Sequence, residues 1–287
     1  MRCSRTSARC SRPTARPFTR RGWFAAWLTC CGPEGVDIIE STPARKITAG
    51  TVETTRGTID ANIILRATEG YTDSIHGHKR QLLPLYSMMV ATEPLPDAVW
   101  DEIGLRDRET FGDLRRIVIY GQRTLDNRFA FGGRAGYFFG SGIKPVISPH
   151  DAAVRNVEQT LRRHFPQLEG FHVTHGWGGL MGAPRNWRPY VHFDSMTGFG
   201  AAGGYTGEGV GASNLAGRIL ADLALERDTD LTTLPWVGKL PPRWEPEPLR
   251  WLGAKALEFL GDRADATELR TGKPSKSWGG LFSRFFQ

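Results

Sequence analysis

The alternation of apolar and polar residues predicts β-strands along much of the chain. "ANIILRAT" (61–68) is a continuous apolar run typical of a buried strand, and it leads into a turn of small residues at 67–70. Two alternating runs separated by Leu125-Asp126-Asn127 predict a β-hairpin. The segments with a strand pattern are residues 35–40, 51–55, 58–65, 82–96, 117–124, 128–136, 172–182 and 198–203.

A spacing of apolar residues close to 3.6 predicts helices after the hairpin and near the C-terminus. In residues 148–168 the apolar positions share one face, and Pro166 ends the helix. Further helices are expected from about Gly211 onward and over 249–260. The order of hairpin, helix and strand predicts an α+β fold, in which flanking helices cover a mixed or antiparallel sheet.

The glycine-rich segment "GFGAAGGYTGEGVG" (198–211) contains G-x-G-x-x-G, a pattern typical of a dinucleotide-binding turn. In that turn the helix begins at the third glycine, which here is Gly203, but further glycines follow it. We therefore interpret 198–203 as a strand and 203–211 as a loop. Successive N–H groups before a helix form a concavity that stabilises negative charge. The loop has no lysine, which disfavours a nucleoside triphosphate and favours an aromatic ring with delocalised negative charge.

The net charge of +7 is confined to the first 33 residues. The chain has 37 Lys and Arg against 30 Asp and Glu, and residues 1–33 hold seven arginines and no acid, so 37 − 7 = 30 basic residues face 30 acidic ones over 34–287. Because residues 34–287 carry no net charge, they do not indicate a nucleic-acid-binding surface. All four cysteines also lie in residues 1–33, so the rest of the chain offers no disulfide framework. We expect a reducing compartment and a cytoplasmic location.

Three origins stay open for the arginine-rich residues 1–33: a non-native start, a targeting segment or a disordered arm. The apolar run "GWFAAWLTCC" within them is only ten residues long. No run of about 18 apolar residues exists, so no transmembrane segment is expected. No ligand spacing typical of a metal site is present, and no metal is expected.

Four segments, in this order, resemble FAD-dependent oxidoreductases of the D-amino-acid oxidase and glycine/sarcosine oxidase type. "GGYTGEGVGASNLAGRILADL" (203–223) is similar to the segment of that family that closes over the flavin. The other three are "RGTIDANIILRATEGYT", "PLYSMMVATEPLP" and "WGGLMG" followed by "RPYV". The resemblance covers residues 35–240, and it implies FAD as the cofactor and an amine or amino acid as the substrate, oxidised by hydride transfer to flavin N5.

The resemblance also implies a division of the chain. Members of this family begin with a strand, a G-x-G-x-x-G turn and a helix that hold the ADP half of FAD, and no such segment precedes residue 35. The alternative is therefore a non-catalytic fragment, or one half of a split enzyme completed by another chain. The expected parts are a leader (1–33), strands of the FAD domain (34–66), a substrate-binding domain (67–185), a flavin-contact loop and helix (186–236) and a helical extension (237–287).

The same resemblance assigns candidate site residues, although none is a certain catalytic residue. Arg134 is a candidate carboxylate clamp or a surface arginine, and His175 is a covalent flavin anchor, a polar contact or a hydrogen-bonded structural histidine. The cofactor residues implied are Ala67, Thr68, Glu69 and Gly70 beside the ring, and Gly204, Tyr205, Thr206, Gly207, Glu208, Gly209, Val210 and Gly211 in the loop. Glu208 is expected to cap neighbouring N–H groups. The substrate candidates are Tyr120, Gln122, Arg134 and Trp177.

Overall fold

A computed structural model describes residues 35–113, 115–116, 118–144, 147–148 and 150–284. The chain divides into two compact units between Pro43 and Ala44, and every element named below lies in the second. Residues 35–40 are not a strand as the pattern predicts, because a strand needs a partner and they pair with none in the described residues. Among the described residues, no helix is both long and apolar enough to cross a membrane.

A small antiparallel meander precedes the predicted buried strand. It consists of β1 (Ala44–Thr48), β2 (Thr51–Thr54) and β3 (Thr58–Asp60), in the order β1-β2-β3. β4 (Ile64–Arg66) follows, and the side chain of Ile64 packs with Ile47 and Ile75 in one apolar cluster. This cluster fixes the meander against the start of β4.

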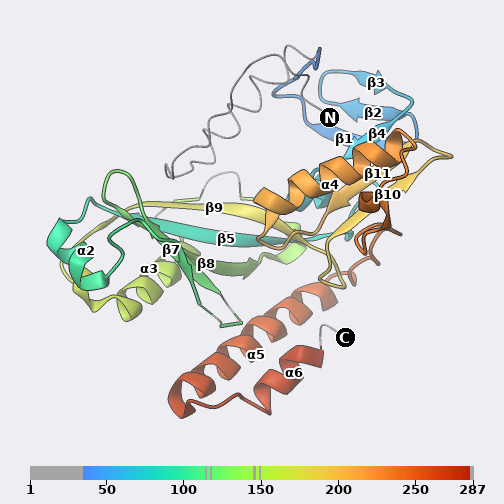
Figure 1. Ribbon diagram of the computed structural model, residues 1–287. Helices are drawn as coiled ribbons and strands as arrows, with labels where there is room; N and C mark the ends of the chain where they lie inside the picture. Colours follow the sequence, from blue (N-terminus) through green and yellow to red (C-terminus); the bar gives the residue numbers. More distant parts are fainter. Residues whose placement is uncertain (1–34, 114, 117, 145–146, 149, 285–287) are drawn as a thin grey trace. The chain divides into compact units, whose positions relative to one another are not determined.

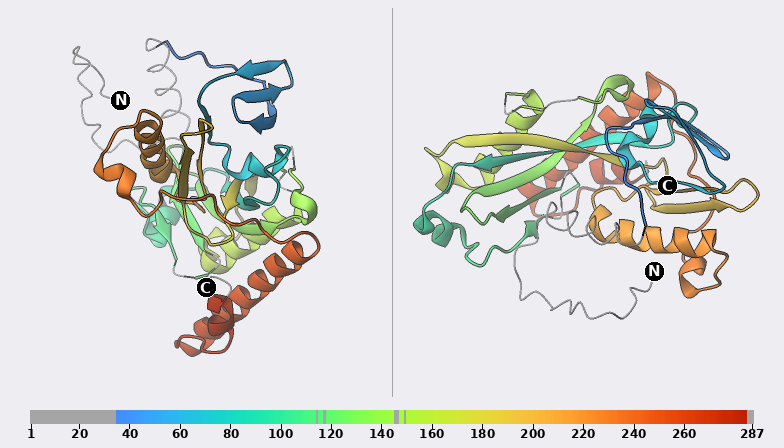
Figure 2. Two further views of the ribbon diagram at one scale, coloured as in Figure 1. Left: turned by 90° about the vertical axis from the view of Figure 1, so that its right-hand side faces the viewer. Right: turned by 90° about the horizontal axis from the view of Figure 1, so that it is seen from above.

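β4 belongs to a second sheet that joins distant parts of the sequence. It pairs in parallel with β11 (Phe199–Gly203), which pairs antiparallel with β10 (Tyr190–Asp194). α4 (Gly209–Ala224) runs alongside β10 and β11 (Figure 2), and its Ile219 packs in a core that includes Ala202. The small residues of β11 let this helix approach closely. The glycine-rich segment is thus a strand, a loop and a helix, as expected, although the helix begins at Gly209 rather than near Gly211.

Five antiparallel strands form the largest sheet, in the order β6-β7-β8-β5-β9 (Figure 1). β7 and β8 are the predicted hairpin. α3 (Ala152–His164) covers one face, where Val157 and Leu161 share an apolar core with Met88 and Phe131. The strands are β5 (Leu83–Thr92), β6 (Phe111–Gly112), β7 (Ile119–Arg123), β8 (Phe129–Tyr137) and β9 (Val173–Ala183).

α5 (Leu249–Thr271) and α6 (Trp278–Arg284) lie on the same side of this sheet as α3 (Figure 1). α5 is longer than the expected 249–260, and it ends where Gly272 takes the left-handed conformation of a C-cap. At its start, the buried Arg250 forms an ion pair of 3.5 Å with the buried Asp73. The shorter helices are η2 (Glu69–Ser74), α2 (Asp97–Ile103), η3 (Phe139–Ser141), η4 (Pro166–Leu168) and η5 (Asp230–Thr233).

The fold therefore mixes helices with antiparallel and mixed sheets, which confirms the predicted α+β class. One sheet presents the glycine loop at the end of β11, and the other presents a face that α3 does not cover. The two meet near the end of β9, where η2 packs on β9.

Candidate functional site

The turn after β4 and the glycine loop after β11 are held together by one carboxylate. Glu69 opens η2 with φ 43, and its side chain accepts the backbone N–H of Gly204 at 3.2 Å and of Tyr205 at 3.1 Å. The N–H of Gly182, at the end of β9, donates to the same carboxylate. The two segments expected to contact the flavin are thus neighbours in space, and Glu69 faces the loop.

Burial dominates the electrostatics of this contact. It raises the pKa of Glu69 above its ordinary value, although the three backbone N–H groups act in the opposite direction. Burial, followed by the charge of Glu69, also raises the pKa of the Tyr205 phenol. The phenol therefore stays protonated at neutral pH.

The loop is closely packed behind Gly204 and open farther on. Gly204 has φ +82, and a Cβ there would collide with the ring of Pro184. At Gly207, with φ +120, a Cβ would have only the Met181 sulfur, 3.9 Å away, as a neighbour, and at Gly211 it would meet nothing within 4 Å. The backbone at Gly207 and at Gly211 therefore has open space beside it, while Gly209 between them has the Tyr205 side chain as a neighbour, and this open space fits a flat ring approaching the loop.

The N-terminus of α4 provides donors toward the same side. Glu208 precedes the helix, and its side chain makes no capping hydrogen bond, contrary to expectation. The carboxylate that accepts N–H groups of the loop is instead that of Glu69 on η2, and its partners Gly204 and Tyr205 precede the helix. The first N–H groups of a helix have no acceptor within it, so those of Gly209, Val210 and Gly211 suit developing negative charge.

The uncovered face of the large sheet carries the substrate candidates in rows. Strand register places Tyr120 beside Gly132, Gly132 beside Met89, and Met89 beside Trp177. In the next row, Gln122 pairs with Ala130, and Ala91 pairs with His175. The face is opposite α3, because Gly121, which alternates with these residues on β7, points at the core ring of Phe129.

This face is open between its aromatic side chains. The ring of Tyr120 lies over Gly132, and its hydroxyl bonds to the hydroxyl of Ser87. Trp177 is 41% exposed, and a Cβ on Gly179 would meet nothing within 4 Å. The amide of Gln122 donates to the backbone oxygen of Arg108 at 3.1 Å. Arg134 pairs with Ser87 in the β8–β5 register.

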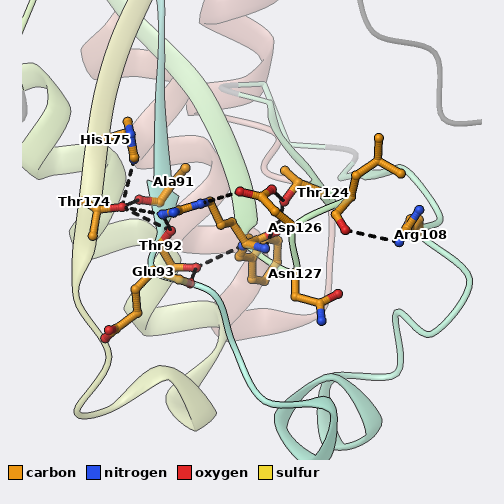
Figure 3. A network of polar contacts seen from close by, with 12 residues as sticks. Ala91, Thr92, Glu93, Arg108, Thr124, Asp126, Asn127, Thr174 and His175 are labelled. Atoms are coloured by element: carbon orange, nitrogen blue, oxygen red, sulfur yellow. Dashed lines mark hydrogen bonds and ion pairs between the residues drawn. The ribbon is translucent and has the colours of Figure 1, made fainter.

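His175 belongs to a polar network at the far end of the hairpin (Figure 3). Its Nδ1 and the hydroxyl of Thr174 are 2.8 Å apart, and that hydroxyl accepts from Arg128 at 3.0 Å. Arg128 in turn pairs with Asp126 at 2.7 Å and donates to the backbone oxygen of Thr92. These contacts support the hypothesis that His175 is a structural histidine.

Sequence patterns missed a buried polar cluster beneath the turn. Arg66, only 2% exposed, donates to the hydroxyl of Tyr190 at 2.8 Å and also contacts His78 and Gln81. Burial and the charge of Arg66 lower the pKa of His78. The available signal was an arginine inside an otherwise apolar strand, which indicates a buried cation with dedicated partners.

Comparison with known proteins places these features in a family. The chain is 32% identical over 205 residues to the probable oxidoreductase OrdL of Rhizobium meliloti (strain 1021), covering 70% of this chain and 45% of that protein. Among solved structures, glycine oxidase from Geobacillus kaustophilus matches with a TM-score of 0.59 at 18% identity, covering 77% of this chain and 57% of the other. Iminodiacetate oxidase from Chelativorans sp. BNC1 matches with a TM-score of 0.58 at 17% identity, covering 77% and 59%.

These structural matches have the same fold, and the chain spans about half the length of the curated relatives that it matches. The family model described as FAD dependent oxidoreductase matches residues 25–223, which is more than half of the chain. The chain therefore belongs to the DAO family of FAD-dependent oxidoreductases, whose cofactor is FAD.

Proposed function

We propose that this chain forms the flavin-facing and substrate-binding part of an FAD-dependent oxidoreductase that oxidises an amine or an amino acid. The observation that carries the proposal is the pair of hydrogen bonds that the backbone N–H groups of Gly204 and Tyr205 donate to Glu69. It joins the two segments expected to contact the flavin, next to an uncovered sheet face. Bound FAD would supply the hydride acceptor, N5, and the residues of the chain orient the reactants around it.

The chain's own groups have separate roles in this proposal. Backbone N–H groups at the start of α4, from Gly209 to Gly211, stabilise negative charge on the reduced cofactor. Trp177 and Tyr120 shape the substrate space on the uncovered face and exclude water from it. Gln122 offers a polar contact, and Arg134 is the proposed clamp for a substrate carboxylate.

The substrate class rests on what the relatives are called. The matched structures include a glycine oxidase and an iminodiacetate oxidase, and the curated relatives include a gamma-glutamylputrescine oxidoreductase of Escherichia coli (strain K12). All three names describe amine or amino-acid substrates. In the proposed division of this chain, 67–185 bind the substrate, 34–66 and 186–236 face the FAD, and 237–287 form an extension.

A second candidate is half of a split enzyme, completed by another polypeptide. One observation favours it: β4 lies at the end of its sheet and pairs only with β11 among the described strands. A parallel strand at a sheet edge presents unpaired backbone groups that a further strand can satisfy. The chain's coverage of about half of its curated relatives agrees with this candidate.

Purification and titration with FAD separate the two candidates. If the first holds, the protein binds FAD with a visible flavin spectrum, and an amine or amino acid bleaches that spectrum without oxygen. If the second holds, the chain alone binds no FAD. It gains the spectrum when co-expressed with the part of the Rhizobium meliloti relative that lies outside the matched region. Failure of both preparations to bind FAD would exclude both candidates.

A further inference from the structure

A cavity lies on the α3 side of the large sheet, opposite the proposed substrate face. It has a volume of about 930 Å³, is bordered by the sheet, α3, α5 and α6, and is partly open to solvent. Its apolar lining includes Leu85, Ile119, Phe131 and Leu257. A cavity of this size is typical of small-molecule sites, and this one combines apolar walls with many charged and polar side chains.

Two opposite charges line this cavity without touching. Arg115 has a buried Nη2 atom that makes no hydrogen bond, while its Nε pairs with Asp113. Asp262, on α5, is near enough for the charge of Arg115 to lower its pKa, although burial and repulsion by Asp265 and Glu258 raise it overall. No ion pair within 4 Å joins Arg115 to Asp262 in the described part of the chain.

Arg116 and Glu258, which also line the cavity, already have partners. Arg116 forms ion pairs with Asp265 at 3.0 Å and with Glu268 at 2.8 Å. Glu258 accepts from Lys255 at 2.7 Å and from the backbone N–H of Tyr137 at 3.2 Å. The Nη2 donor of Arg115 and the carboxyl of Asp262 are therefore available to a ligand, as is the exposed Arg163 of α3, which also lines the cavity.

We propose that this cavity binds a small zwitterion with an apolar side chain, namely a free α-amino acid. Its carboxylate would accept from the Nη2 of Arg115, its ammonium would face Asp262, and its side chain would lie on the apolar lining. A zwitterion meets both charges at once, whereas a simple amine leaves the buried Nη2 of Arg115 without an acceptor and a simple acid leaves the exposed carboxyl of Asp262 without a counter-charge. This inference does not rest on the proposed oxidoreductase function.

The test uses three ligands that share one apolar group. Isothermal titration calorimetry of the purified chain compares L-phenylalanine with phenethylamine, which has only the ammonium group, and with 3-phenylpropionate, which has only the carboxylate. We expect L-phenylalanine to bind at least tenfold more tightly than either of the other two compounds. Equal affinities, or no binding of the amino acid, would overturn the proposal.

Variants then locate the site. Arg115→Met and Asp262→Asn should each weaken binding of L-phenylalanine at least tenfold. Ala266→Trp, on an exposed position of α5 that lines the cavity, should block binding while both charges remain. Gln122→Ala, on the opposite face, should leave binding unchanged. Loss of binding in Gln122→Ala alone would place the amino acid at the proposed flavin site and overturn the second site.

Discussion

The carboxylate of Glu69 accepts the backbone N–H of Tyr205 at 3.1 Å, across 136 positions of sequence. This bond fixes the glycine loop to the turn after β4. Glu69→Ala leaves the N–H groups of Gly204, Tyr205 and Gly182 without their acceptor, and should lower the free energy of unfolding by about 2–3 kcal/mol. Urea unfolding measures this loss, and FAD titration should show weaker binding.

The matched control is Glu208→Ala in the same loop. Glu208 is exposed and makes no capping bond, so its removal should change the free energy of unfolding by less than about 0.5 kcal/mol. Equal effects of the two substitutions would show that Glu69 does not hold the loop.

The raised pKa of Glu69 predicts a pH dependence of stability. Between its ordinary value of 4.5 and the raised folded value, the folded state keeps a proton that the unfolded chain has lost. The contribution of Glu69 to the free energy of unfolding should therefore fall as pH rises through this window. Glu69→Gln cannot ionise, so the wild type should lose stability relative to this variant as pH rises from 4.5. Urea unfolding at several pH values measures the difference, and a wild type that keeps or gains stability relative to Glu69→Gln as pH rises would contradict the expectation.

Substitutions of two glycines in the glycine-rich segment 198–211 test its roles in folding and in cofactor binding separately. Gly204→Ala combines positive φ with a collision against Pro184, and should destabilise the fold by more than about 2 kcal/mol. Gly211→Ala lies in α4 with open space around it, and should stabilise the helix by about 0.5–1 kcal/mol. If its backbone faces the flavin, the same change should weaken FAD binding at least tenfold. Unchanged FAD affinity in Gly211→Ala would place the ring elsewhere.

The sequence predicts the elements of this region better than their contacts. Alternation and glycine content identify β11, the loop and α4, because these depend on neighbouring residues. The acceptor for Gly204 could not be found this way, since Glu69 lies far off in sequence and exposed loop carboxylates such as Glu208 look equally suitable. Residues 35–40 show the reverse error: a local strand pattern is insufficient when no partner strand lies beside it.

The alternation of side chains along a strand predicts which residues share the proposed substrate face. Tyr120 and Gln122 are two residues apart, as are His175 and Trp177, so each pair must share a face. Which strands lie between the pairs depends on β5 inserting between β8 and β9, a pairing that no local pattern specifies. The buried partners of Arg66 are likewise set by tertiary structure.

Substitutions of two tryptophans, one on the proposed substrate face and one in the core, should have different effects. Trp177→Ala removes a side chain that is 41% exposed, and should change stability by less than about 1 kcal/mol while raising KM for the amine. Trp100→Ala removes a fully buried ring, and should cost about 3–5 kcal/mol of stability. Thermal unfolding and steady-state kinetics measure both. A Trp177→Ala variant with unchanged kinetics would show that this face does not contact substrate.

The ion pair between Arg250 and Asp73 joins the start of α5 to the end of η2, with both side chains 5% exposed. Arg250→Met leaves Asp73 buried without its counter-charge, so the free energy of unfolding should fall by about 3–5 kcal/mol. Adding Asp73→Asn removes that charge while keeping an acceptor for the N–H of Arg80, and should recover part of the loss. The partly exposed pair of Lys255 and Glu258, with side chains 41% and 31% exposed, is the control, and Lys255→Met should cost less than about 1 kcal/mol.

The same two variants, Arg250→Met alone and together with Asp73→Asn, test whether the C-terminal extension (237–287) helps to position the proposed flavin site. η2 begins with Glu69, so loosening its far end at Asp73 should also weaken the hold on the loop. FAD affinity should then fall in Arg250→Met and recover partly in the double variant, in parallel with stability. If the FAD affinity of Arg250→Met is unchanged while its free energy of unfolding falls, the contact of Glu69 with Gly204 and Tyr205 persists without the ion pair. In that case α5 stabilises the fold but does not position the loop.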